Sequence, residues 1–281
     1  MKKILIALLL FAGSWTAFAQ TRQFSWELDA MDGSRTGCVS SSASNIAEAM
    51  GTMKGCAYLA PNGKVFRGGL TPKVARVLLA AQPAMAWVKE VIGYSSAEMV
   101  EEYPECALWN WFVDEIMRAT ADSTGKQVDI GIVNTGGVRI DMPKGDILLD
   151  DIMSMFPFNN SLCYVALRGR DVRAVLEQMA ASTFEALGGM KVVAQAGELV
   201  SVTVGDEPLD DDRLYGVATI SFLLHGGDGY SLAEPAEEVI RCNGIIFDTM
   251  VAHVRNLTAQ GKPIEYHTDG RLRILGEGET L

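Results

Sequence analysis

Asn134 and Arg139 lie on either side of two adjacent glycines, directly after an apolar strand pattern. The segment from Val128 to Ile132 alternates apolar residues with polar or small ones, which is the period of a strand. Gly136 and Gly137 follow, and glycine lets a backbone approach a flat or anionic ligand closely. Asn134 and Arg139 then offer an amide and a guanidinium to such a ligand.

Two further runs place an aromatic residue at a rigid or glycine-rich position. Phe158 follows a proline that no helix interior tolerates, so its ring is held at a fixed corner. The second run extends from Phe222 to Tyr230 and contains three glycines before its final ring. The simplest alternative places the rings of Phe158 and Tyr230 in the core and pairs Arg139 with a neighbouring surface carboxylate.

The order of these runs resembles the C-terminal domain of the 5′-nucleotidase family. The matching runs, between about residues 105 and 275, are N-T-G-G-V-R, P-K-G-D-I, F-P-F-N-N, L-R-G, G-G-D-G-Y and D-G-R-L. In that family, an N-terminal two-metal phosphoesterase domain precedes a C-terminal domain that holds the nucleoside. The resemblance implies an α/β fold with a mixed sheet of α+β character, in which strands and helices alternate.

The resemblance also implies roles for individual residues. The rings of Phe158 and Tyr230 match two aromatic positions that hold the base between them. Asn134 matches a residue that hydrogen-bonds the base, and Arg139 matches an arginine that reaches toward the phosphate. The full set of expected substrate-binding residues is Asn134, Gly136, Gly137, Arg139, Phe158, Gly227, Asp228 and Tyr230.

The chain lacks the residues with which the family hydrolyses phosphate esters. The family's metal domain uses histidine motifs to hold two metal ions, and His225, His253 and His267 match none of these motifs. A second phosphate-directed arginine is also missing, because acidic residues and Tyr103 stand before Glu105. We therefore expect no catalytic residue and no cofactor in this chain, and divalent metals only in a partner phosphoesterase.

The leading interpretation is a nucleoside-recognition component of a split 5′-nucleotidase-like hydrolase that is not catalytic alone. Its partners are then a nucleotide or nucleoside and a separate metallophosphoesterase subunit. A different class remains open, namely a non-catalytic protein that binds nucleotides or nucleosides. A third interpretation is a structural relic whose site no longer binds a ligand.

The N-terminus has the pattern of a secretory signal peptide. Residues 1–19 combine two lysines, an apolar run and an A-x-A cleavage pattern, and the run is too short to span a bilayer. This pattern predicts a periplasmic or secreted protein without membrane insertion. We expect residues 20–62 to form an N-terminal extension and residues 63–281 to form the domain that resembles the family.

The composition is acidic, with 35 Asp and Glu against 24 Lys and Arg and a formal net charge of −11. A surface of this sign repels nucleic acid and anionic membranes, so we expect neither as a partner. Any phosphate must then be met by a local arginine or by a metal supplied from elsewhere.

Five cysteines are an odd number for an oxidising compartment. Cys38 and Cys56 lie close together in the extension and are candidates for a disulfide, with two free thiols as the alternative. Cys106, Cys163 and Cys242 stand in apolar contexts, and we expect them to be buried as small hydrophobic residues.

The elements that periodicity predicts include two helices, which begin near residues 71 and 105, and a strand at residues 215–223. A helix from about residue 105 has apolar residues at three-and-four spacing and precedes the central strand. Thr71 begins the other helix, with an expected hydroxyl cap, and Val74, Val77 and Leu78 form its apolar stripe. Residues 215–223 are predicted to form a strand.

Overall fold

The computed structural model describes residues 33–276, except residue 43, together with residues 278 and 279. The expected signal peptide, residues 1–19, lies outside the described residues. The first part of the expected extension, residues 20–32, lies outside them as well.

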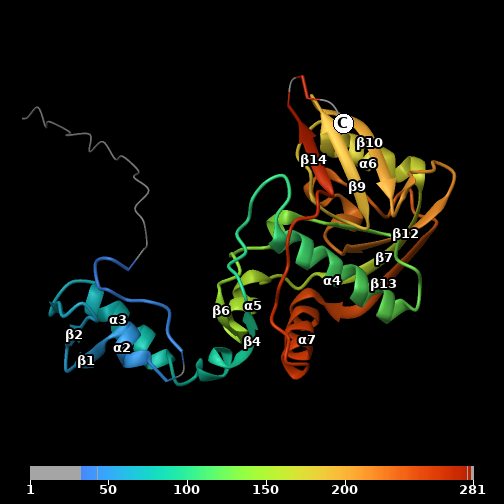
Figure 1. Cartoon of the computed structure of the whole chain (residues 1–281). Helices are drawn as coiled ribbons and strands as arrows, with labels where there is room; N and C mark the ends of the chain where they lie inside the picture. The colour runs from blue at the N-terminus through green and yellow to red at the C-terminus, as the bar shows by residue number, and fades with distance from the viewer. Residues whose placement is uncertain (1–32, 43, 277, 280–281) are drawn as a thin grey trace, which may run out of the picture.

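The described chain alternates helices and strands, as the sequence predicts for the α/β class (Figure 1). The helices are α2 (Ile46–Met50), α3 (Thr71–Ala81), α4 (Ala107–Thr124), α5 (Leu149–Met155), α6 (Gly169–Ala180) and α7 (Ile246–Ala259), with 3-10 turns η1 (Ala86–Lys89), η2 (Thr135–Gly137), η3 (Leu223–His225) and η4 (Gly227–Gly229). The strands are β1 (Thr52–Lys54), β2 (Ala57–Leu59), β3 (Val65–Phe66), β4 (Val91–Ser95), β5 (Ile130–Val133), β6 (Gly145–Leu148), β7 (Ser161–Arg168), β8 (Ala186–Gly188), β9 (Met190–Gln195), β10 (Glu198–Val204), β11 (Glu207–Pro208), β12 (Leu214–Ile220), β13 (Glu238–Ile245) and β14 (Leu272–Leu275).

Residues 33–85 form a small unit, which we call the N-terminal lobe. Strands β1, β2 and β3 make a three-stranded antiparallel sheet, and Tyr58, Ala60 and Ala75 form a core separate from the main one. Figure 1 shows the lobe standing apart from the rest of the fold. The expected boundary between residues 62 and 63 falls inside the β2–β3 hairpin, so residues 63–85 group with the extension rather than with the following domain.

Helix α3 presents its apolar stripe to solvent. Val74, Val77 and Leu78 are exposed, because the helix packs on the lobe through the face that carries buried Ala75. Thr71 is the first helical residue rather than the cap, and no side chain caps this N-terminus, contrary to the expected hydroxyl cap. The stripe therefore contributes nothing to the core of the lobe.

Cys38 and Cys56 are free thiols, so the expected disulfide is not present in the structure. The Cys38 sulfur lies 3.1 Å from the hydroxyl oxygen of Tyr58, whose buried ring occupies the space beside it. Cys56 is exposed in the turn between β1 and β2. The other three cysteines are buried, as the sequence predicts.

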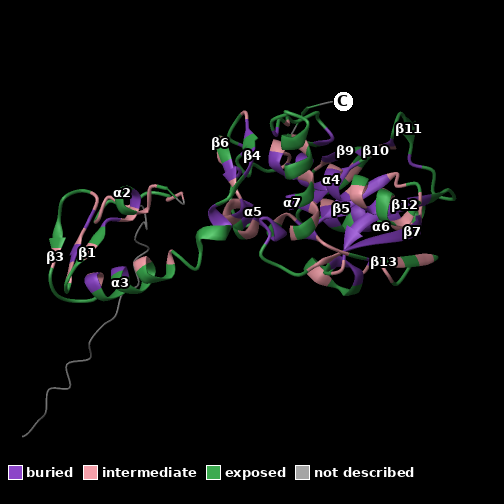
Figure 2. Cartoon of the chain, turned by 90° about the horizontal axis from the view of Figure 1, so that it is seen from below, coloured by how far each residue is buried: buried purple, intermediate pink, exposed green. Residues whose placement is uncertain are grey.

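The main domain, residues 86–276, is built on two larger sheets. A five-stranded sheet has the order β13-β7-β12-β5-β8, in which only β5 and β12 run parallel. A four-stranded sheet has the order β11-β10-β9-β14. Helix α4 packs on the five-stranded sheet, and α6 contacts both β7 and β10. Figure 2 shows buried residues concentrated along these central strands and α4.

Helix α4 confirms the amphipathic pattern in the sequence. Leu108, Phe112 and Ile116 are completely buried in the main core. Gly125 ends the helix in a left-handed conformation, with its amide bonded to the Ala121 carbonyl, which is a common helix termination. The burial of this apolar face holds α4 against the sheet.

Arg271 joins the C-terminal segment to α4. Its guanidinium donates to Asp114 at 2.7 and 3.0 Å and to Asp269 at 2.8 and 2.9 Å, and Tyr266 also donates to Asp114. Burial disfavours the charged guanidinium, but the two carboxylates outweigh it and hold the pKa of Arg271 above its usual value. The C-terminal segment is therefore anchored by a charged network in which the arginine is buried and the two carboxylates are partly exposed.

We expect Arg271→Ala to lower the free energy of unfolding by about 3 kcal/mol, because it leaves the carboxylate of Asp114 without its cation. Urea denaturation monitored by circular dichroism measures the change. Arg255→Ala is the control, since it removes an exposed ion pair with Glu90 and should cost less than about 1 kcal/mol. Equal losses for the two variants would show that burial of the Arg271 pair does not matter.

Candidate functional site

One edge of the five-stranded sheet collects the segments that the sequence singles out. Parallel strands β5 and β12 end there, at Val133 and Ile220, and antiparallel β7 begins there, at Ser161. We name the adjoining segments the 134 loop (residues 134–139), the 156 loop (residues 156–160) and the 221 loop (residues 221–230). Loops that are far apart in the chain therefore lie at the same edge of the sheet.

Hydrogen bonds tie the three loops into one surface. Ser221 donates its amide to the Ser161 carbonyl (2.9 Å) and its hydroxyl to Asn160 (3.2 Å), and it accepts the Ser161 amide (3.1 Å). The Arg139 amide donates to the carbonyl of Met155 at 3.0 Å. The 134 loop and the 221 loop are therefore both held against the segment that carries Phe158.

Asn134 places a buried amide at this edge. It is 7% exposed, and its Oδ1 has no hydrogen-bond partner among the described residues. A side chain at Gly137 would bring its Cβ within 3.1 Å of Oδ1, whereas a Cβ at the exposed Gly136 would meet only Asn134 Nδ2, at 3.9 Å. A buried acceptor without a donor is costly, so a ligand that donates a hydrogen bond here would be stabilised.

Glu185, which no sequence motif indicated, stands beside the 134 loop. One carboxylate oxygen accepts the amide (2.8 Å) and the hydroxyl (3.2 Å) of Thr135. Burial raises the pKa of Glu185, and the negative charge of Asp228 raises it further. Asp228 is exposed and has a φ of +50°, a left-handed conformation that is uncommon outside glycine and often found at functional positions.

Arg139 is exposed and is not held by a carboxylate. Its Nη1 donates to the carbonyl of Gly136 at 3.0 Å. No ion pair of Arg139 with Asp141 or Asp146 occurs among the described residues, and Asp141 accepts the amide of Glu101. The guanidinium is therefore open to solvent at the end of the 134 loop.

The two rings assigned from the sequence lie in different environments. Phe158 is 46% exposed in the 156 loop. Tyr230 is only 4% exposed, and its hydroxyl donates to the Thr183 carbonyl at 3.2 Å. Burial also raises the pKa of the Tyr230 hydroxyl. The expectation that Tyr230 presents a ring face to a ligand is therefore wrong in this structure, because the core covers the ring.

Phe222 is the exposed ring of the 221 loop, at 42%. A Cβ at Gly227 would approach its ring atoms to 2.6 Å, so only glycine lets the ring lie against the loop. The sequence places Phe222 inside a strand expected over residues 215–223, but β12 ends at Ile220. Phe222 belongs to the same glycine-rich run as Tyr230, and this was the sequence feature that could have indicated a surface role for Phe222.

Metal clusters and membrane spans are both missing from the part of the chain that the structure describes. Among those residues, no group of three or more His, Cys, Asp or Glu side chains is placed to hold a metal ion. Within the same part of the chain, no helix has both the length and the apolar character needed to cross a membrane.

The fold and the edge site define a mixed α/β domain with a polar and aromatic surface at one edge of its five-stranded sheet. Residues 89–234 match the family model described as the 5′-nucleotidase, C-terminal domain. This match spans more than half of the chain, and the chain belongs to that family. The membership inferred from the sequence motifs is confirmed, and the N-terminal lobe lies outside the matched region.

Individual relatives agree with this membership. Protein UshA of Salmonella pullorum is 32% identical over 120 residues, which cover 41% of this chain and 22% of that protein. A 5′-nucleotidase-related protein of Glossina morsitans morsitans is 26% identical over 66% of this chain and 38% of its own length. The structure of a 5′-nucleotidase precursor from Thermus thermophilus is 26% identical, with a TM-score of 0.66, and covers 78% of this chain and 45% of that one. The chain thus spans less than half the length of these relatives.

Stability losses of different size are expected on truncation of Tyr230 and Phe222 in the 221 loop. Tyr230→Ala should lower the free energy of unfolding by about 3–5 kcal/mol, because it empties a buried site. Phe222→Ala should cost about 1 kcal/mol, because much of that ring already contacts solvent. Chemical denaturation of both variants makes the comparison. A larger loss for Phe222→Ala would contradict the assignment of Tyr230 to the core.

Proposed function

We propose that this protein is the nucleoside-recognition component of a split 5′-nucleotidase-like system. It binds a nucleotide or nucleoside at the edge site, while a separate metallophosphoesterase subunit with divalent metals hydrolyses the phosphate ester. The pattern of residues 1–19 supports export to the periplasm or beyond. One observation carries the proposal, namely two exposed rings on hydrogen-bonded loops beside a buried amide oxygen without a partner among the described residues.

Phe158 and Phe222 hold the base between them in this proposal. Both rings are nearly half exposed, and they flank the paired ends of β7 and β12, where Ser221 ties their loops together. Stacking on an aromatic face contributes about 1–3 kcal/mol for any base, because every base has a π-face. Tyr230 has a supporting role, since its buried ring fixes the end of the 221 loop.

Polar groups around the rings fit the rest of a nucleoside. Asn134 Oδ1 needs a donor, and an amino or imino group on a base edge supplies one. Asp228 and Glu185 are acceptors that suit the hydroxyl groups of a sugar. Gly136 and Gly137 leave room for the base to approach the backbone of the 134 loop. The site is therefore complementary to a flat base joined to a hydroxylated ring.

Arg139 addresses the phosphate of a nucleotide in this arrangement. It is exposed and has no carboxylate partner among the described residues, so its charge is available to an anion. A guanidinium binds phosphate oxygens through charge-assisted hydrogen bonds. The proposal assigns hydrolysis to another subunit because His225, His253 and His267 match none of the metal-binding motifs of the family.

Loss of either of the two rings that hold the base should weaken nucleoside binding. We expect Phe158→Ala and Phe222→Ala each to raise the Kd for adenosine by about 5- to 150-fold, equivalent to about 1–3 kcal/mol of stacking. Isothermal titration calorimetry measures the change, and Tyr230→Phe is the control, because it keeps the buried ring. The absence of adenosine and AMP binding by the parent protein at millimolar ligand would disprove the proposed function.

Arg139→Ala should separate nucleotide from nucleoside binding. The variant should bind AMP about tenfold more weakly, since a hydrogen bond to a charged group contributes about 1.5–3 kcal/mol, while its affinity for adenosine stays unchanged. The same calorimetric titrations apply, with Arg255→Ala as a matched arginine variant whose partner is Glu90. Equal weakening of both ligands would remove Arg139 from phosphate recognition.

A further inference from the structure

The N-terminal lobe carries an apolar surface that no described part of the chain covers. On α3 and the residue before it, Leu70 is 76% and Val77 is 68% exposed, and Val74 and Leu78 lie beside them. A contiguous apolar patch that faces solvent is typical of a surface that binds another molecule. We call these four residues the α3 face.

A groove runs along one side of the α3 face. Its volume is about 570 Å³, and Tyr58 and Ala75 form part of its lining together with Val74 and Leu78. Arg35 lines it as well, which adds a positive charge to an apolar hollow. At protein interfaces, large side chains of one partner fill pockets of this kind on the other.

The charge of the lobe is opposite to that of the main domain. Residues 33–85 contain one acidic residue, Glu48, and six basic ones, and residues 86–276 contain 29 acidic against 15 basic residues. The six basic side chains are all exposed, and none of them forms an ion pair with another described residue: Arg35, Lys54, Lys64, Arg67, Lys73 and Arg76. The lobe is thus a basic surface attached to an acidic domain.

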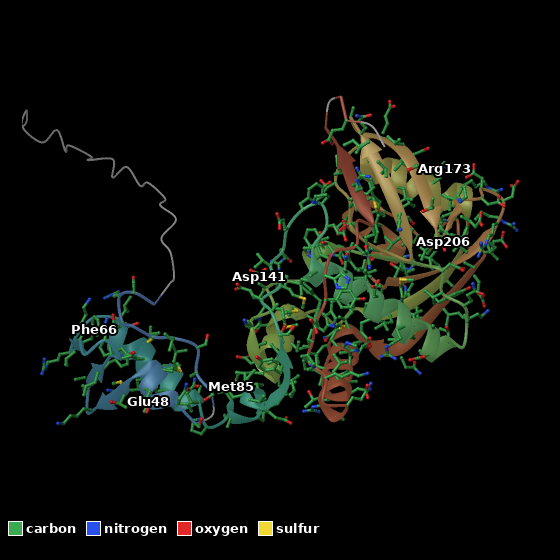
Figure 3. All side chains as sticks on the ribbon, in the orientation of Figure 1. Glu48, Phe66, Met85, Asp141, Arg173 and Asp206 are labelled. Carbon is green, nitrogen blue, oxygen red and sulfur yellow. The ribbon has the colours of Figure 1, made fainter. Side chains whose placement is uncertain are left out.

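The main domain presents a surface that is complementary to the lobe in apolar character and in charge. The segments around residues 98–103 and 140–142 are joined by a backbone bridge between Met99 and Met142 and by the Glu101 amide, which donates to Asp141 at 2.8 Å. Exposed apolar and acidic side chains occur together on this acidic patch: Glu98, Val100, Glu102, Tyr103, Ile140 and Asp141. Figure 3 shows Asp141 on the main domain and Glu48 and Phe66 on the separate lobe.

We propose that the α3 face of one copy docks on the acidic patch of a second copy. Apolar side chains then cover one another, while Lys73 and Arg76 lie opposite Glu98 and Glu102. The lobe stands apart from its own main domain (Figure 1). The lobe of each copy can therefore contact the main domain of the other copy, and these two equivalent contacts form a symmetric dimer. Nucleic acid and anionic membranes are poorer partners, since both repel the acidic domain that the lobe carries with it.

The oligomeric state of the full chain tests the first half of this proposal. We expect size-exclusion chromatography with light scattering at low ionic strength to give the mass of two chains. Val77→Asp should give the mass of one chain, because a carboxylate would be buried in the apolar contact. Val200→Asp is the matched control, since Val200 is an exposed valine on β10 and the dimer should persist. A parent protein that is monomeric at its highest soluble concentration would refute the proposal.

Reversal of charge tests which surfaces meet. Lys73→Glu with Arg76→Glu should give monomers, and so should Glu98→Lys with Glu102→Lys. An equal mixture of these two variants should regain the two-chain mass, because each lobe again faces an opposite charge. A dimer that survives both reversals would place the contact elsewhere and overturn the assignment. So would a monomeric parent that co-sediments with phosphatidylglycerol vesicles, which would identify lipid as the occupant.

Discussion

The antiparallel pairing of β7 with β12 is the constraint on which the rest of the site depends. Its register sets Leu162 opposite Ile220, so the segment before β7 and the segment after β12 emerge at one edge. The parallel pairing of β5 with β12 adds the 134 loop to the same edge. A shift of one residue in this register would turn buried side chains toward solvent, so core burial and site geometry are specified together.

Close packing of α4 on the sheet sets a second limit. A Cβ at Gly131 would approach the side chains of Val113 and Met117 to 2.6–2.7 Å, and one at Gly188 would approach Met117 to 2.6 Å. Glycine at these strand positions therefore lets the helix approach β5 and β8 closely, which holds the end of β5 and the Asn134 that follows it. The close-packed apolar contact of α4 with β5 and β8 therefore supports the polar edge site.

In the proposed function and the proposed dimer, the division of charge separates recognition from assembly. The edge site combines the positive Arg139 with the acidic residues Asp228 and Glu185, so both signs of charge are represented there. The lobe carries only one acidic residue, and its cations have no carboxylate partners among the described residues. Many cations of the main domain are paired instead, as Arg271 is with Asp114 and Asp269. Unpaired charge beside an exposed apolar helix is characteristic of a surface that functions by contact with another macromolecule.

The sequence by itself determined the family, the alternation of helices and strands, the course of α4 and the glycine turns, because these follow from local periodicity and backbone chemistry. Only the tertiary structure decided which ring of the 221 loop faces solvent, which face of α3 is covered, and that Cys38 contacts Tyr58 rather than Cys56. A local pattern records that a side chain is apolar or aromatic. It does not record which distant residue fills the space around that side chain, and this neighbour decides whether the group supports the core or meets a ligand.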